Sequence, residues 1–172
     1  LEKVIFMPTG IQPFKCDNTP AADADRIAML EIAVAGIPEF EISRHEIDRE
    51  GLSYTIYTLR AMRELYVGAE IFFIIGIDAF LDIQKWMYAE ELLREFSFII
   101  GMRPGCDAQK LTALIAEIRS AYGTTLIEID NPMIDVTSPE IRECVQSDCW
   151  AGTEGKIPEK VKEYIIAHEV YN

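Results

Sequence analysis

The chain has 172 residues, which suits one compact domain with a sizeable core and is short for two. Its formal net charge of −13 argues against binding of duplex nucleic acid or of anionic membrane surfaces, although one local basic pocket for a nucleotide stays compatible with it. No apolar run approaches a membrane span, and no signal peptide is recognisable. Four scattered cysteines and two histidines, without C-x-x-C spacing, argue against a zinc site and fit free thiols in a reducing cytoplasm.

Strands and helices are predicted to alternate along the chain. Apolar runs or apolar alternation predict strands at 4–7, 40–47, 71–75, 96–100 and 125–129. Apolar residues at helical spacing predict helices at 23–35, 53–65, 111–121, 139–145 and 158–165. In the second helix, Ser53 is the expected N-cap and Leu65 is expected on the core face. Because the strands are too apolar to be half exposed, we expect an α/β fold with a doubly wound parallel sheet and helices on both faces, in a single domain.

Candidate ligand residues follow the predicted strand ends, where open α/β sheets bind ligands. Lys15 follows the first strand and has the reach for a phosphate, with a solvated loop lysine as the alternative. Thr55 opens a helix, where capping and packing are the alternatives. Arg103 lies beyond the fourth strand, in a turn that ends at Gly105. This clustering favours a nucleotide site over a solvated surface.

The strand at 71–75 ends at Gly76-Ile77-Asp78. A glycine at a strand end permits close approach of a ligand to the backbone. The carboxylate of Asp78 is well placed to accept hydrogen bonds from ribose hydroxyls, and capping of the next helix is equally compatible with it. Trp86 follows; tryptophan usually lies in the core, but one in a connection near a ligand-facing loop is placed to stack on a flat ring.

The segment 134–142 reads as a short strand running into a helix. Thr137 and Ser138 are N-cap residue types, and Pro139 suits the first helical turn. Ser138 and Arg142 are four residues apart, so a hydroxyl and a guanidinium converge beside a helix start that favours anions. The alternative is a capped surface helix with a solvated arginine.

In this order, the segments resemble bacterial nicotinate mononucleotide adenylyltransferase, a family of the nucleotidyltransferase superfamily, and the resemblance runs nearly end to end. The matching segments are the loop that ends at Lys15, Ser53-Tyr54-Thr55 with Thr58-Leu59, Gly76-x-Asp78 with Trp86, Met102-Arg103-Pro104-Gly105, Thr137-Ser138-Pro139-Glu140-Ile141-Arg142, and the closing helix from Ile157-Pro158 to Tyr171. The segment with Gly76, Asp78 and Trp86 is the most specific of them.

The resemblance implies a Rossmann-like fold and adenylyl transfer from ATP to nicotinate mononucleotide, which gives nicotinate adenine dinucleotide and pyrophosphate in NAD biosynthesis. It implies Mg²⁺ with ATP as substrate, and it leaves homo-oligomer formation open. The charge and the cysteine pattern of the chain lead us to expect no nucleic-acid or membrane partner and a cytoplasmic location. ATP would bind to Gly76, Asp78, Ser138, Arg142 and Lys15. The mononucleotide would bind to Thr55, Trp86, Met87 and Arg103, with the Trp86 ring on the pyridine.

The sequence departs from the family pattern in three places. Pro139 stands where the family has the last hydroxyl of its phosphate motif, and Phe14 precedes Lys15 where the family often has histidine. The family's first strand and its H-x-G-H loop are absent, so no catalytic residue is assigned, and we expect roughly 30–40 further residues upstream of Leu1. Two alternatives stay open: a related nucleotidyltransferase with another acceptor such as nicotinamide mononucleotide, and a nucleotide-binding fragment without turnover.

Overall fold

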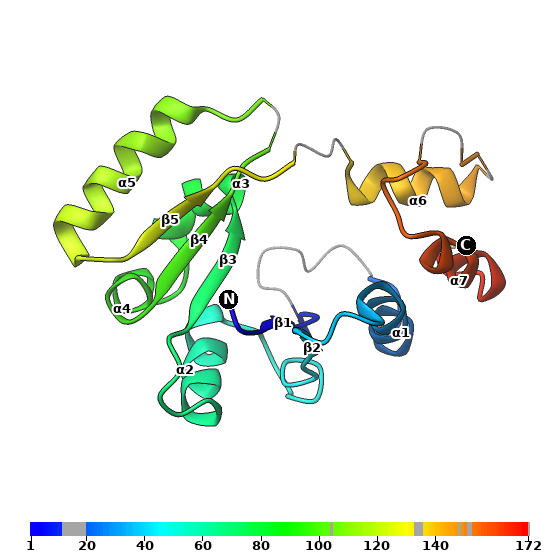
Figure 1. The fold of residues 1–172 in the computed structure, drawn as a ribbon, viewed down its shortest axis with the longest axis horizontal. Coiled ribbons are helices and arrows are strands. Elements are labelled where there is room, and N and C mark those ends of the chain that lie inside the picture. Colours follow the sequence, from blue (N-terminus) through cyan, green and yellow to red (C-terminus); the bar gives the residue numbers. More distant parts are fainter. Residues whose placement is uncertain (12–19, 104, 133–135, 148, 151–152, 172) are drawn as a thin grey trace. The chain divides into compact units, whose positions relative to one another are not determined.

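The computed structural model describes residues 1–11, 20–103, 105–132, 136–147, 149–150 and 153–171 (Figure 1). The chain divides into two compact units. The central unit is Tyr54–Asp135, and the terminal unit combines Leu1–Ser53 with Val136–Asn172. Each unit is described by itself.

The central unit is built on a parallel three-stranded sheet in the order β3-β4-β5 (Figure 1). The strands span Phe72–Gly76 (β3), Ser97–Gly101 (β4) and Leu126–Ile129 (β5). Their helices are α2 (Thr55–Leu65), α3 (Ile77–Leu81), α4 (Ala89–Glu95) and α5 (Ala108–Tyr122), with a 3₁₀ turn at Ile83–Lys85. Parallel strands joined through helices define an α/β fold, so the predicted fold class is confirmed.

One face of this sheet carries the core of the central unit. Phe98 and Ile100 of β4 are fully buried, and the Phe98 ring lies 6.1 Å from that of Phe80 and 6.3 Å from that of Phe73. Helix α5 adds three buried residues at helical spacing to the same core: Leu111, Ile115 and Ile118. The burial of this face explains why the strand residues that point to it are apolar.

The alternate strand residues point to the opposite face of the sheet. Ile74, Ile99 and Ile127 are in register across the three strands. Their exposed fractions are 47%, 7% and 41%. The opposite face is therefore covered at β4 and partly open at both neighbouring strands.

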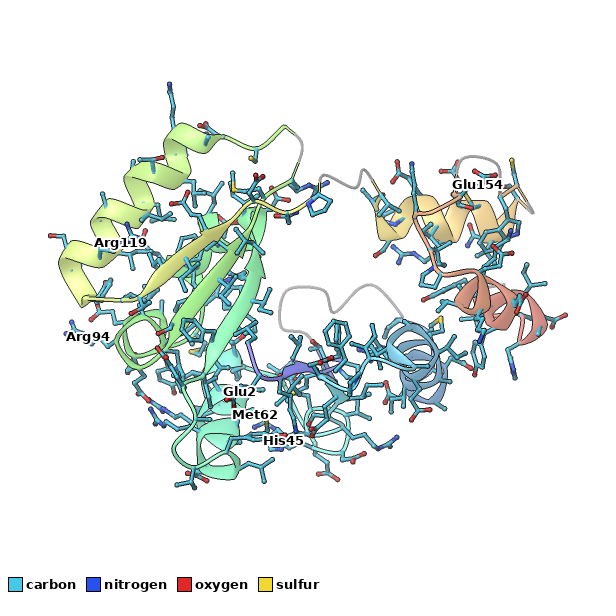
Figure 2. The ribbon with its side chains drawn as sticks, in the orientation of Figure 1. Glu2, His45, Met62, Arg94, Arg119 and Glu154 are labelled. Atoms are coloured by element: carbon cyan, nitrogen blue, oxygen red, sulfur yellow. The ribbon has the colours of Figure 1, made fainter. Side chains whose placement is uncertain are left out.

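Helix α2 begins later than the sequence predicts. Three residues of its predicted core face are buried, namely Ile56, Leu59 and Met62, the last labelled in Figure 2. Leu65, by contrast, is 66% exposed. The prediction that Ser53 is the N-cap is wrong: Tyr54 is the N-cap, and no side chain caps the helix. The reason is that the backbone N–H of Ser53 donates to Ile11 O at 2.9 Å, which keeps this segment extended.

An ion-pair cluster braces α2 against α4. Arg60 and Arg63 of α2 both donate to the carboxylate of Glu95 at the end of α4, Arg63 at 2.9 Å. The hydrogen bonds from Arg60, and then those from Arg63, hold the pKa of Glu95 below its ordinary value. An arginine also links helix α5 to β5: the side chain of Arg119 (Figure 2) donates a hydrogen bond to the backbone oxygen of Leu126 at 2.7 Å.

The terminal unit holds a parallel pair, β1 (Val4–Phe6) and β2 (Phe40–Ile42), with the helices α1 (Asp23–Val34), α6 (Ser138–Gln146) and α7 (Glu159–Ala167). Helices α1 and α7 come from opposite ends of the chain, and the Tyr164 hydroxyl of α7 donates to Asp25 Oδ1 of α1 at 2.9 Å. Val161, Ile165 and Val170 form a small core with residues of α1.

Strand β2 is shorter than the predicted strand at 40–47. The chain turns instead, because Asp48 N donates to Arg44 O at 2.9 Å and His45 N donates to the Ser43 hydroxyl. None of the described helices is long and apolar enough to cross a membrane. Within the same residues, no group of three or more His, Cys, Asp or Glu side chains is placed to hold a metal ion.

Candidate functional site

The carboxyl ends of the three strands in the central unit are in register. Gly76 of β3 pairs with Gly101 of β4, which pairs in turn with Ile129 of β5. The residues two positions beyond these partners are Asp78, Arg103 and Asn131. Three polar side chains therefore follow the aligned end of the sheet, where parallel α/β folds place their ligands.

Asp78 and Arg103, both predicted from sequence, form an ion pair. Arg103 Nη1 donates to Asp78 Oδ2 at 2.7 Å, and the side chains are 51% and 61% exposed. An ion pair exposed to this degree contributes little to stability, so a ligand can replace either partner at low cost. Free of each other, the carboxylate accepts from hydroxyl groups and the guanidinium donates to phosphate or carboxylate oxygens.

Gly76 leaves the sheet end open to a ligand. A Cβ atom added at Gly76 would meet nothing within 4 Å, and the backbone there is exposed. The empty space beside Gly76 therefore agrees with the expectation that a ligand can approach the backbone closely at this residue.

Asn131 anchors the backbone next to Arg103. Its Oδ1 accepts from Met102 N at 2.7 Å, and its Nδ2 donates to Met102 O at 3.0 Å. The same Nδ2 donates to Pro132 O at 3.2 Å. The carboxamide thus continues the pairing of β4 with β5 by one residue beyond the last strand partners.

Trp86 and Met87 lie in a tight turn between the 3₁₀ turn and α4. Trp86 is half-buried, packs against the core, and meets the Phe73 ring edge-on at 6.2 Å. Met87 is 48% exposed. Ala89 N donates to Trp86 O at 3.2 Å across the turn. Among the described residues, no acceptor takes the backbone N–H of Met87, so this donor is available to a ligand.

Tyr88 completes the turn in a left-handed conformation, with φ of 56°, which a residue with a side chain rarely adopts. Its ring lies 5.8 Å from that of Tyr57 on α2, edge to face. A hydrogen bond with the Tyr88 hydroxyl raises the pKa of Tyr57. Thr55 opens the same helix α2 and is half-buried. Two helices thus flank the turn that holds Trp86 and Met87.

In the terminal unit, α6 begins as predicted. Thr137 is its N-cap, and the hydroxyl of Thr137 and the carboxylate of Glu140 form a reciprocal capping box. Ser138 is exposed in the first turn, and Arg142 follows one turn later, half-buried. The capping box uses the N-terminal donors of Thr137 and Glu140 and leaves Ser138 free of that role. Lys15 lies outside the described residues.

The comparisons with known proteins identify the family of the chain. The family model described as cytidylyltransferase-like matches residues 1–144. A protein of Moorella thermoacetica named "Probable nicotinate-nucleotide adenylyltransferase" is 39% identical, over 99% of this chain and 78% of its own length. One of Thermoanaerobacter sp. with the same name is 34% identical, over 99% of this chain and 81% of its own.

The chain belongs to the nicotinate-nucleotide adenylyltransferase family.

A solved structure of the same class supports the fold of this nicotinate-nucleotide adenylyltransferase family member. The nicotinic acid mononucleotide adenylyltransferase of Plasmodium falciparum complexed with NaAD is similar with a TM-score of 0.72 and 20% identity, over 99% of this chain and 83% of that one. The same enzyme complexed with APC gives a TM-score of 0.69. The predicted Rossmann-like fold, a doubly wound parallel α/β architecture, is confirmed.

The structure adds residues to the site that the sequence did not single out. Asn131 belongs to the row with Asp78 and Arg103, and its place two residues after a strand end was the available signal. Tyr57 and Tyr88 meet only because α2 and α4 are neighbours. In this member of the nicotinate-nucleotide adenylyltransferase family, six of the predicted site residues lie in the central unit, and two of them, Asp78 and Arg103, are in direct contact. The six are Thr55, Gly76, Asp78, Trp86, Met87 and Arg103.

Proposed function

We propose that this protein transfers the adenylyl group of ATP to nicotinate mononucleotide, with release of pyrophosphate. The observation that carries the proposal is the pairing of Asp78 with Arg103 at an open sheet end, in a chain 34–39% identical, over nearly its whole length, to proteins named for this reaction.

In the central unit, the mononucleotide is recognised by an aromatic ring and three donors. The half-buried ring of Trp86 stacks on the pyridine, because an aromatic face with one side packed on the core keeps its position. The backbone N–H of Met87 and the hydroxyl of Thr55 bind the nicotinate carboxylate, and Arg103 binds the mononucleotide through its guanidinium. This carboxylate would be the basis of preference for nicotinate over nicotinamide.

The proposed ATP ligands are the residues that the sequence predicts for this substrate. The Asp78 carboxylate accepts from the ribose hydroxyls, and the open backbone at Gly76 admits the adenosine. Ser138 and Arg142 bind the ATP phosphates at the start of α6, with Lys15 as a further phosphate ligand. Magnesium enters with ATP, since Mg²⁺ takes its ligands mainly from phosphate oxygens and water rather than from a protein cage.

The chemistry asks the protein for alignment and charge stabilisation. A phosphate oxygen of the mononucleotide attacks the α-phosphorus of ATP, the new P–O bond forms, and the bond from the α-phosphorus to the leaving pyrophosphate breaks. The attacking phosphate is already anionic, so the step needs no proton transfer. Arg142 stabilises the negative charge that collects on pyrophosphate, which is the electrostatic part of the catalysis. We place this reaction in the cytoplasm.

The test is pyrophosphate release by the purified natural protein with ATP, Mg²⁺ and, in separate reactions, nicotinate mononucleotide, nicotinamide mononucleotide or phosphopantetheine. We expect turnover with nicotinate mononucleotide at a kcat/KM at least tenfold above the others. A higher kcat/KM with nicotinamide mononucleotide would identify that compound as the acceptor instead. Stabilisation by ATP without product from any acceptor would identify a nucleotide-binding protein instead.

Two variants test the site, each with a matched control. Trp86→Ala and Arg142→Ala are expected to lose most of kcat/KM. Trp150→Ala removes the other tryptophan of the chain, and Arg44→Ala removes an arginine from an exposed ion pair with Asp48; both controls are expected to keep activity within twofold. Full activity in Trp86→Ala and Arg142→Ala would refute the assigned site.

A further inference from the structure

The strongest unassigned feature of the central unit is the double hydrogen bond between the carboxamide of Asn131 and the backbone of Met102. Met102 N donates to Oδ1 at 2.7 Å, and Nδ2 donates to Met102 O at 3.0 Å. Among side chains of this length, only a carboxamide offers one acceptor and one donor at neutral pH without a charge. The half-buried Asn131 therefore reproduces, with its side chain, the two bonds of a β-sheet ladder.

This anchor lies where the sheet ladder has ended. Backbone pairing between β4 and β5 stops at Gly101 and Ile129. Among the residues that the structure describes, no hydrogen bond other than those of Asn131 joins the segment that starts at Met102 to the chain after β5. The residue after Met102 is Arg103, whose guanidinium crosses to Asp78 on the next strand end at 2.7 Å.

We propose that Asn131 is a positioning residue for the reaction, which fixes the backbone before Arg103 and so aims Arg103 along the row of strand ends. The proposal rests on the proposed function only for the ligand that Arg103 binds. A guanidinium whose backbone is fixed loses less conformational freedom when it meets a ligand. Loss of the anchor should therefore weaken the binding of the mononucleotide and leave the affinity for ATP nearly unchanged.

Two substitutions separate the parts of the anchor. Asn131→Asp keeps the shape and the acceptor for Met102 N but places an oxygen against Met102 O, which removes the donor. Asn131→Ala removes both. We expect KM for nicotinate mononucleotide to rise about tenfold in Asn131→Ala, the factor for loss of one hydrogen bond between Arg103 and the mononucleotide, and KM for ATP to stay within twofold. Hydrogen exchange of the Met102 amide should become faster in the ligand-free variant.

A double-mutant cycle with Arg103→Ala shows whether Asn131 acts through Arg103. If it does, Asn131→Ala raises the mononucleotide KM less than twofold in the Arg103→Ala background, because the aimed group is already gone. Thr124→Val is the matched control: it removes the buried hydrogen bond from Thr124 Oγ1 to Leu93 O, at the opposite end of β5. We expect it to lower the melting temperature without changing the ratio of the two KM values.

An unchanged mononucleotide KM in Asn131→Ala, or an equal rise with and without Arg103, would overturn the proposal. If the protein without substitutions makes no product from any acceptor, the proposed function fails. The positioning role is then tested in the ligand-free protein instead. There, the rate at which phenylglyoxal modifies Arg103, measured by peptide mapping, should rise in Asn131→Ala and stay constant in Thr124→Val. An unchanged rate in Asn131→Ala would overturn the positioning role independently of the reaction.

Discussion

Replacement of Ile100 or Ile74 by alanine tests whether the two faces of the central sheet differ as described. Both residues are isoleucines on neighbouring strands of the same unit, and both changes lower β-propensity equally. Ile100 is fully buried in the core, while Ile74 points to the opposite face and is 47% exposed. The difference between the two losses of stability therefore reports burial alone.

The magnitudes follow from the buried carbon atoms. Truncation of Ile100 removes buried carbons worth about 0.8 kcal/mol each, or about 2.4 kcal/mol in all. The closed cavity left behind raises the loss to about 3–4 kcal/mol. At Ile74 about half of the transfer free energy is lost and no closed cavity forms, so we expect about 1 kcal/mol.

The assay is urea unfolding at pH 7, followed by circular dichroism, with the free energy of unfolding extrapolated to water for each variant. We expect Ile100→Ala to lower the midpoint about three times as much as Ile74→Ala, with similar slopes. Equal losses would refute the reasoning, because they would mean that the face with Ile74 is as fully covered as the face with Ile100.

Three further predictions concern the surroundings of the site. Glu95→Gln should lower the free energy of unfolding by about 1 kcal/mol at pH 7. Because the hydrogen bonds from Arg60 lower the pKa of Glu95 in the folded state, the stability difference between Glu95→Gln and the unsubstituted protein should persist above the ordinary carboxyl pKa. It should vanish as the pH falls through the pKa of Glu95 in the folded state, which urea unfolding at several pH values would detect. Tyr57→Ala removes the ring and the hydrogen bond that support the left-handed turn at Tyr88, and should raise the mononucleotide KM about fivefold, with Tyr57→Phe near twofold in steady-state kinetics. Thr137→Ala should cost about 1 kcal/mol of unfolding free energy through loss of the α6 cap, and Thr137→Ser should restore it.

The parts of the fold that depend on local pattern were predictable from the sequence. β3 and β4 were found because parallel strands buried on a sheet read as apolar runs, and the start of α6 was found because Thr137 is a cap residue type. β2 was predicted too long, since the bonds that turn the chain at Ser43 and Arg44 are made by individual groups and leave no apolar pattern.

In the candidate site too, some features depend on local sequence pattern and others on contacts between distant segments. Asp78 and Arg103 were found from their places after strand ends, but their ion pair depends on the register of β3 with β4, which no single segment encodes. Asn131 was missed for the same reason, because its partner lies 29 residues earlier in the chain. Lys15 and the upstream histidine loop stay predictions.

The interleaved order of the two units has a consequence for synthesis on the ribosome. The central unit is one continuous segment, Tyr54–Asp135, and all its strands emerge together. Helix α1 emerges earlier but finds its partner α7 only at the far end of the chain, since Asp25 and Tyr164 are 139 residues apart. At about 5–20 residues per second, this interval lasts roughly 7–30 s. During it, Met29 and Ile32, which α7 later covers, are open to chaperones and to other nascent chains.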